Sequence, residues 1–254
     1  MRSYGLLLLT CICLLCACFP VHAAKPGFMK SASADLDGDG KKETISLVND
    51  GKESNGHFTL KINALSVRGE YGMEAPEGFQ LVKIDGSDKY TEVVVSLPGG
   101  SDWFQTQIYW YDGHAIHEMN GDDQLALFGI PSFPGNGCIY GNRWMGFWKS
   151  TDKYVLDKKT RTVKQVPQQF YYVSGLDEKP VVGKVLHTIP IYETREKKAV
   201  IANLRVGSKV LFLLCDNSVS DNNNWYLVKS ESGLVGWIQE KAIQPNFEGL
   251  MWAG

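Results

Sequence analysis

The first acidic stretch of the chain has residue types and spacing that suit a cation. Asp35, Asp37 and Asp39 stand at alternate positions, and Lys41 and Glu43 continue the spacing. Calcium takes about six to eight oxygen ligands at roughly 2.3–2.6 Å, supplied by flexible carboxylates and carbonyls. We expect the three aspartates to bind through their side chains, Lys41 through its carbonyl, and Glu43 by completing the shell. Because these carboxylates would repel one another without a cation, the spacing predicts a structural calcium site.

This stretch matches only the first half of an EF-hand loop. The twelfth position would be Ser46, which cannot supply a bidentate carboxylate, and no helical pattern flanks the loop. We therefore expect a β-hairpin form of the loop. The alternative is an Asp- and Gly-rich turn that holds no metal, since Asp-Gly is a common hairpin signal.

A related stretch begins at position 83, which is 48 residues after Asp35. Lys83 takes its first ligand position, and the loop has one extra residue. An ammonium group at a cation position argues against calcium, so an ordinary polar turn is predicted here. The alternative is that the Lys83 amine, held by Asp85 and Asp88, replaces the ion.

The segments that must position these loops have the pattern of strands. Helical periodicity is almost absent, and short apolar runs end at Gly, Asp and Asn. Strands are predicted at residues 44–48, 58–62, 79–84, 93–97, 105–111 and 114–119, with a hairpin turn at Asp112-Gly113. Residues 124–128 are the best candidate for a short helical turn.

The two related stretches indicate an internal repeat. Each unit consists of a strand, an acidic turn and three more strands, and a period of about 40–50 residues with four strands is that of a propeller blade. A third unit that lacks the acidic turn is predicted to begin near Gly135. Since two or three units cannot close a propeller, which takes at least about four, we expect an open stack of small antiparallel sheets.

The composition changes near residue 174. Residues 174–180 are polar and contain Gly and Pro, as in a linker. Short strands are predicted beyond them at residues 182–187, 191–192, 200–201, 210–214, 225–229 and 235–238. Five or six such strands in about 65 residues predict a small β-barrel, so the fold class is all-β with two domains.

The start of the chain has the features of an export signal. Arg2 precedes an apolar run at residues 6–19, and Val21-His22-Ala23 places small residues at a cleavage site. The run is short for a membrane span, which needs roughly 20 apolar residues. We predict a signal peptide at residues 1–23 and an exported protein with no transmembrane helix after cleavage. Lipidation at Cys18 is the alternative to cleavage after Ala23.

Charge and cysteine content exclude some classes of protein. The formal charge of −2 lacks the basic footprint of a nucleic-acid binder. Of six cysteines only Cys138 and Cys215 remain after the signal segment, and no CxxC pair survives. An inter-domain disulfide and two buried free thiols both remain open.

Motifs of catalysis are missing from the sequence. It contains no Gly-x-Ser-x-Gly elbow, no HExxH and no phosphate loop. His114 and His117 are three residues apart on a predicted strand and would face opposite sides, which makes them a poor metal pair. We therefore expect a protein that is not an enzyme, and we assign no catalytic residue.

The first part of the chain resembles a known type of repeat. Residues 35–47, and a strand ending in Tyr109-Trp110-Tyr111-Asp112-Gly113, are similar to FG-GAP or VCBS-type repeats of exported proteins. The resemblance implies blade-like β units and calcium in the acidic loop. It assigns residues 25–174 to a repeat domain.

The last part resembles a bacterial SH3 domain over residues 182–246. The matching motifs are Ile189-Pro190-Ile191-Tyr192, Trp225 to Lys229, and a Gly236-Trp237-Ile238 ending. Such modules often bind cell-wall peptides or glycans, which makes Tyr192, Trp225 and Trp237 candidate ligand-binding residues. The alternative is that at least one tryptophan is a core residue, because small barrels are built around large aromatics.

Three functions are open on these observations. The first is an envelope-associated binding or adaptor protein whose partner is cell-wall peptide or glycan, or another envelope protein. The second is a cell-wall-active hydrolase, which a cleft with convergent carboxylates in residues 28–173 would favour. The third is a structural partner of another envelope protein, which a large exposed aromatic patch would favour.

Overall fold

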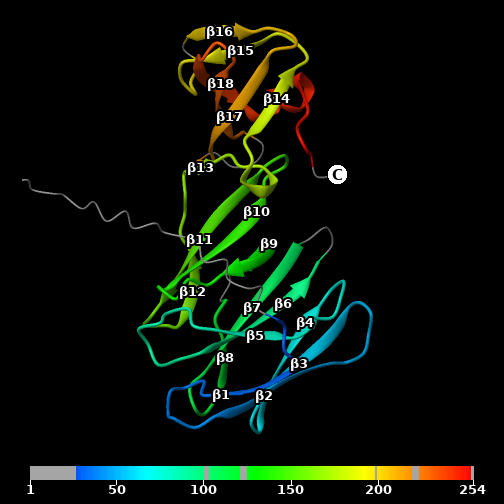
Figure 1. The fold of residues 1–254 in the computed structure, drawn as a ribbon, viewed down its shortest axis with the longest axis vertical. Coiled ribbons are helices and arrows are strands. Elements are labelled where there is room, and N and C mark those ends of the chain that lie inside the picture. The colour runs from blue at the N-terminus through cyan, green and yellow to red at the C-terminus, as the bar shows by residue number, and fades with distance from the viewer. Residues whose placement is uncertain (1–26, 100–102, 121–124, 198, 219–222, 253–254) are drawn as a thin grey trace, which may run out of the picture.

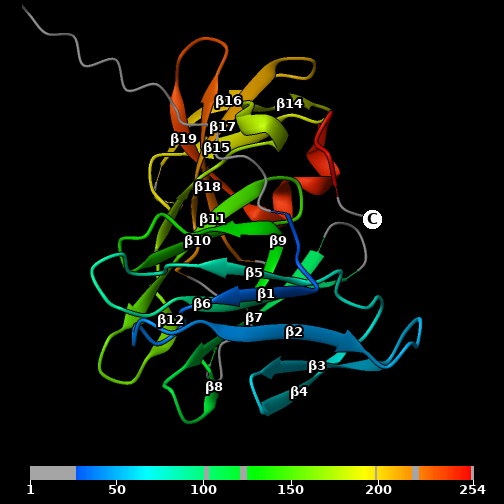
Figure 2. The same ribbon diagram turned by 60° about the horizontal axis from the view of Figure 1, so that its bottom comes forward.

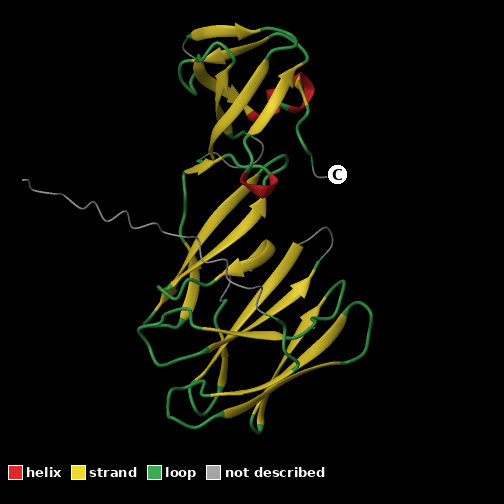
Figure 3. Cartoon of the chain, in the orientation of Figure 1, coloured by secondary structure: helices red, strands yellow, loops and turns green. Residues whose placement is uncertain are grey.

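The computed structural model describes residues 27–99, 103–120, 125–197, 199–218 and 223–252. Over these residues the fold is all-β, as predicted, with three antiparallel sheets and three short 3₁₀ turns (Figure 3). The predicted signal peptide, its cleavage site and Cys18 lie outside the described residues. No helix in the described part of the chain has the length and apolar character to cross a membrane.

The first twelve strands form three successive antiparallel meanders of four strands (Figure 1). The first meander is β1 (Ser31–Ala34), β2 (Glu43–Asn49), β3 (Gly56–Ile62) and β4 (Leu65–Tyr71). The second is β5 (Phe79–Val82), β6 (Glu92–Pro98), β7 (Trp103–Tyr111) and β8 (Ile116–Glu118). The third is β9 (Leu125–Ser132), β10 (Cys138–Trp144), β11 (Lys149–Asp157) and β12 (Thr162–Gln165).

The predicted strands of this region are confirmed, and the predicted helical turn is wrong. Residues 125–132 are the strand β9, whose backbone pairs with β7 on one side and β10 on the other. Main-chain groups of those two strands would otherwise lack partners, and this long-range requirement overrides the local pattern. Pairing of β7 with β9 also joins the second and third meanders into one eight-stranded sheet, whereas the first meander is a separate sheet.

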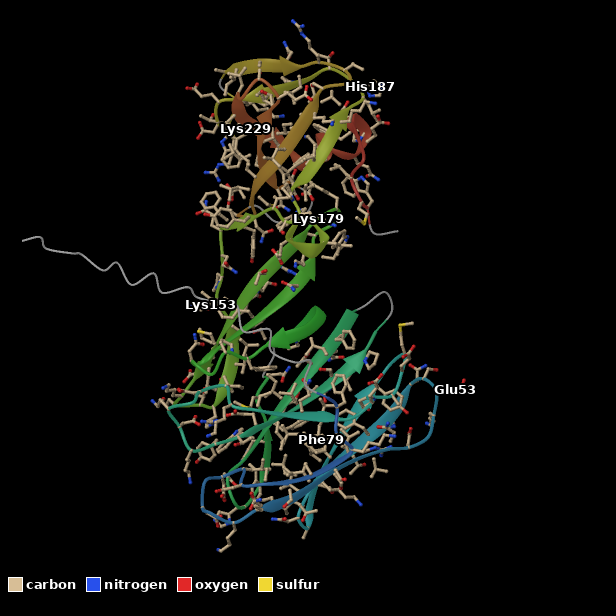
Figure 4. The ribbon with its side chains drawn as sticks, viewed as in Figure 1. Glu53, Phe79, Lys153, Lys179, His187 and Lys229 are labelled. Atoms are coloured by element: carbon tan, nitrogen blue, oxygen red, sulfur yellow. The ribbon has the colours of Figure 1, made fainter. Side chains whose placement is uncertain are left out.

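Two hydrophobic cores lie on opposite faces of β6 and β7. Successive side chains of a strand point to opposite faces, so Val93 and Val95 pack towards the first meander while Val94 packs towards the third. Phe79, labelled in Figure 4, is fully buried in the first of these cores. The three meanders are thus layered one on another, as Figure 1 and Figure 2 show from two sides.

The remaining strands form the third sheet, in the order β16-β15-β19-β18-β17-β14-β20, with β13 beside β17. Their bounds are β13 (Phe170–Tyr172), β14 (Val181–Val185), β15 (Ile189–Tyr192), β16 (Val200–Leu204), β17 (Lys209–Asp216), β18 (Trp225–Ser230), β19 (Val235–Gln239) and β20 (Phe247–Glu248). The 3₁₀ turns are Leu176–Glu178, Glu240–Ala242 and Gln244–Asn246. The six predicted strands are present, but no sheet in the described part of the chain is closed into a barrel.

The third sheet takes part of its core from the first 174 residues. Phe147 and Trp148, both in the turn between β10 and β11, belong to the same buried cluster as Phe212 and Tyr226. The Trp148 indole N–H donates to the Tyr226 hydroxyl at 3.1 Å. Strand β13, which we assigned to the repeat domain, also pairs with β17. Lys179 marks the connecting segment in Figure 4.

Cys138 and Cys215 are both free thiols. Cys138 begins β10, whereas Cys215 lies in β17 and is fully buried. Burial raises the pKa of the Cys215 thiol to about 12. A thiol in this environment stays protonated and is a structural, unreactive group.

Trp148→Ala tests how firmly the third sheet is attached to the third meander. Trp148 is fully buried, so its removal leaves a cavity and takes one hydrogen-bond donor from the Tyr226 hydroxyl. We expect the free energy of unfolding to fall by about 3–5 kcal/mol, measured by urea denaturation. Tyr172→Ala is the matched control, since Tyr172 is 85% exposed and should change stability by less than about 0.5 kcal/mol. A loss below about 1 kcal/mol for Trp148→Ala would contradict this packing.

Candidate metal site and aromatic surface

Residues 35–42, the first loop, connect β1 to β2 and bring three carboxylates together. Asp35, Asp37 and Asp39 each offer one oxygen, and these oxygens all lie within 4.8 Å of one another. Two oxygens bound to one calcium ion at roughly 2.3–2.6 Å can be about 5.2 Å apart at most. The three aspartates are therefore close enough to share one ion, as their spacing predicted.

Backbone N–H groups of the loop orient these carboxylates. Asp35 accepts from Gly38 at 2.7 Å and from Gly40 at 3.0 Å. Asp37 accepts from the Asp39 N–H at 3.0 Å, and the bond from the Lys41 N–H at 2.7 Å lowers the pKa of Asp39. Gly38 and Gly40 have φ of 70° and 87°, a region in which a side chain is strained. The chain reversal therefore depends on glycine.

Glu43 has a different place from the one expected. Its carboxylate accepts the Leu36 N–H at 2.8 Å and is buried. Among the described residues, the oxygen cluster contains Asp35, Asp37 and Asp39 but not Glu43. Glu43 thus ties the start of the loop to the start of β2. Lys41 lies in the loop, with its ammonium group 3.4 Å from Asp39.

Residues 83–91, the second loop, repeat this plan between β5 and β6. Glu92 accepts the Ile84 N–H at 3.0 Å, as Glu43 accepts from Leu36. Asp85 accepts from the Ser87 N–H at 2.9 Å, and Asp88 from the Tyr90 N–H at 3.0 Å. The two stretches are therefore similar in three-dimensional structure as well as in sequence.

The two loops also contact the next meander in the same way. The Leu36 carbonyl accepts the Thr91 N–H at 3.0 Å, and the Ile84 carbonyl accepts the Gly137 N–H at 2.7 Å. Thr91 directly precedes β6 and Gly137 directly precedes β10, which are the second strands of their meanders. Because the surroundings match, a difference between the loops can be traced to individual side chains.

Positively charged side chains contact the acidic groups and carbonyls of the second loop. The Lys83 amine donates to the carbonyls of Asp88 and Tyr90, each at 3.3 Å. The alternative to an ordinary polar turn has this amine held by Asp85 and Asp88. Instead Lys158 forms an ion pair with Asp85, and Arg161 forms ion pairs with Asp88, at 2.6 Å, and with Glu92.

The turn that supplies Lys158 and Arg161 has a counterpart beside the first loop. Lys158 follows Asp157 between β11 and β12, and Gly113 follows Asp112 between β7 and β8. A Cβ on Gly113 would lie 2.7 Å from the Asp37 carboxylate, so this turn touches the first loop but brings no cation to it. Lys41 and Lys89 act on Asp39, whereas no ion pair is found for Asp35 or Asp37 in the described residues.

Arg161 is the centre of a buried polar and aromatic cluster that the sequence did not reveal. Its guanidinium lies 4.4 Å from the Tyr90 ring and 5.1 Å from the Trp110 ring. Glu92 is fully buried, and burial raises its pKa while Arg161 opposes that rise. The pair is 69 residues apart, and no local pattern of sequence reports a contact at that separation.

Tyr192, Trp225 and Trp237 come together on the third sheet, and we call them the aromatic surface. Tyr192 pairs with Trp237 across β15 and β19, and its ring lies 6.3 Å from that of Trp225. Trp225 is buried, as expected for at least one tryptophan, whereas Tyr192 and Trp237 are half-buried. A groove of about 260 Å³ that Tyr192 lines lies alongside.

Two cations that sequence reasoning missed cover this surface. Arg195 lies 5.7 Å from the Trp237 ring and forms an ion pair with the buried Asp216. The Lys197 amine lies 5.7 Å from the rings of both Tyr192 and Trp225. Cation–π contacts of this kind hold the positive charges against the ring faces. The only signal in the sequence is that both residues follow Tyr192 closely.

A larger, polar groove of about 670 Å³ lies where the first meander meets β7 and β8. Its lining includes Gln105, Gln107 and Glu118 on one side and Glu70 on the other. Desolvation by the walls raises the pKa of Glu118, although its side chain is partly open to solvent. No sequence pattern pointed to this groove, because its two sides are far apart in the chain.

Comparison with known proteins found no matching family model, no matching curated protein and no matching solved structure.

Arg161→Met tests the charge balance of the second loop. Without Arg161 the buried Glu92 has no partner charge, and we expect a loss of about 3–5 kcal/mol of unfolding free energy at neutral pH. The loss should shrink as the pH falls towards the raised pKa of Glu92, because a protonated Glu92 needs no cation. In a Glu92→Gln background the same substitution should cost less than half as much. Equal losses in both backgrounds, measured by urea denaturation, would contradict the pairing.

Proposed function

We propose that the protein is an exported, non-enzymatic binding protein of the cell envelope. In this proposal the three meanders are FG-GAP/VCBS-like repeats stabilised by calcium. The third sheet is an SH3-like module that binds cell-wall peptide or glycan. The observation that most favours binding by this module is the aromatic surface with Arg195 and Lys197 against it.

The chemistry of that surface suits ligands of the cell wall. Half-buried aromatic rings offer flat apolar faces with polar edges, and such faces can stack on sugar rings. Arg195 and Lys197 add donors for carboxylates, and charge-assisted bonds to carboxylates are among the stronger hydrogen bonds. Wall peptides carry carboxylates and wall glycans carry sugar rings, so one surface of this composition serves either ligand.

Calcium in the first loop is supported by the contrast between the two loops. In the second loop Lys83, Lys158 and Arg161 balance the acidic groups. In the first loop the equivalent turn presents Gly113, and three carboxylates share a small volume. Asp35, Asp37 and Asp39 would hold the ion there, and the oxygen-only donor set suits a hard cation such as calcium.

A wall-active hydrolase is the second candidate function. It is favoured by one observation, that Glu70 and Glu118 line the same polar groove. Glycoside hydrolases commonly use two carboxyl groups, one of them an acid with a raised pKa, and the pKa of Glu118 is raised. Release of reducing ends from sacculi in the pelleting experiment below would favour this candidate.

The calcium proposal predicts a difference between matched substitutions. Calcium at about 100 times its Kd should raise the Tm by about 5–10 °C, because a ligand that binds only the folded state stabilises it. Asp37→Asn should abolish the shift. Asp85→Asn, at the equivalent position of the second loop, should lower the Tm but leave the calcium shift intact. An equal shift in wild type and Asp37→Asn, measured by differential scanning fluorimetry, would contradict the site.

The wall-binding proposal predicts pelleting with purified sacculi. Lys197→Gln and Trp237→Leu should each reduce the bound fraction several-fold, because they remove a donor and a ring face from the aromatic surface. Lys229→Gln is the matched control, an exposed lysine of the same sheet, and should pellet like wild type. Loss of pelleting in a chelator would connect the first loop to the binding-competent fold. Wild-type protein that stays in the supernatant with calcium and without it would contradict wall binding.

A further inference from the structure

We propose that the polar groove between the first meander and β7–β8 is a binding site for a neutral oligosaccharide. Its volume of about 670 Å³ is within the range of about 300–1,000 Å³ that ligand sites occupy. The site is on different sheets from the aromatic surface, so the inference does not rest on wall binding by the third sheet. It also concerns binding alone and requires no cleavage.

The groove forms where the two sheets separate. Gln105, Gln107 and Tyr109 are alternate residues of β7 and share one face, and Tyr109 joins the hydrophobic core while the two glutamines line the groove. Opposite them, a Cβ on Gly69 would overlap the Phe58 ring and lie 2.9 Å from the Gln107 amide oxygen. Glycine therefore allows β4 to approach the glutamine side chain closely.

The polar groups of the groove are fixed before any ligand arrives. The buried Tyr109 hydroxyl donates to the Gln107 amide oxygen at 2.6 Å. This bond fixes the plane of the amide and directs its N–H donors away from Tyr109. At the rim of the groove, His57 lies 3.4 Å from both Asp50 and Glu70. Groups that are already ordered lose little entropy on binding.

The composition of the lining selects the class of ligand. Of twelve lining residues three are glycines, and each of the other nine has a side chain that ends in a hydrogen-bonding group. Because the described lining has no aliphatic side chain, an apolar ligand or the apolar side chains of a peptide would find few matching contacts. Glu70 and Glu118 disfavour an anionic ligand, which favours a neutral one.

Sugar hydroxyls match these groups well. Each hydroxyl donates one hydrogen bond and accepts others, whereas amides offer both donor and acceptor and carboxylates accept only. A row of planar amide and carboxylate groups can therefore bind neighbouring hydroxyls of a sugar ring in pairs. At Gly72, which also lines the groove, nothing lies within 4 Å of where a Cβ would stand, and this leaves space for a sugar ring.

The test is a titration of the isotope-labelled protein followed by ¹H–¹⁵N NMR. The probes are tetrasaccharides of β-1,4-linked N-acetylglucosamine, β-1,4-linked glucose and α-1,4-linked glucose, with tetra-alanine as the peptide comparison. At up to about 10 mM, where ligands with millimolar Kd bind, we expect at least one saccharide to shift the amide signals of Gly69, Gly72 and Gln107. Tetra-alanine should shift none of them.

Matched variants locate the site. Gln107→Leu should weaken binding about tenfold, since it removes hydrogen bonds worth about 1.4 kcal/mol. Tyr109→Phe should weaken binding less, since it removes only the hydrogen bond that orients the Gln107 amide. Trp237→Leu should bind the saccharide like wild type, which separates this site from the aromatic surface. The proposal is overturned if no saccharide shifts these signals, if only the peptide does, or if Gln107→Leu binds as tightly as wild type.

Discussion

Repulsion between carboxylates that are gathered in a tight turn is the constraint that the two acidic loops share. Both loops anchor their first apolar residue with a buried glutamate, Glu43 or Glu92, and both place aspartates at their tips. In each case a hairpin turn of the following meander covers the loop. Where that turn has Lys158 and Arg161, the charge is balanced within the chain. Where it has Gly113, we propose that a cation from solution completes the balance.

This constraint also orders the stack of meanders. The carbonyls of Leu36 and Ile84 bond to the next meander at equivalent points, so each loop fixes the position of its neighbour. Between the loops, β6 is buried on both faces and shares its side chains between two cores. We therefore expect loss of charge balance in one loop to weaken the contact between whole layers. Trp148 extends the same structure into the third sheet, since its side chain completes that core.

The sequence predicted what depends on local spacing. The three aspartates converge as their alternate positions required, and most strands lie where apolar alternation put them. Tyr192, Trp225 and Trp237 were grouped by a resemblance and not by local spacing, and they share one surface. Contacts over long separations could not be predicted. Arg161 reaches Glu92 across 69 residues, the polar groove joins β4 to β7, and β9 is a strand because its neighbours need partners. The order of the third sheet, which leaves it open, likewise depends on pairing that periodicity does not report.

The most direct measurement is anomalous scattering from crystals grown with calcium. The difference in charge balance between the loops predicts one peak, within about 2.6 Å of carboxylate oxygens of Asp35, Asp37 and Asp39, and none at Lys83 in the second loop. A peak beside Asp85 and Asp88, or a first loop without a peak at saturating calcium, would contradict the view that the first loop takes its cation from solution.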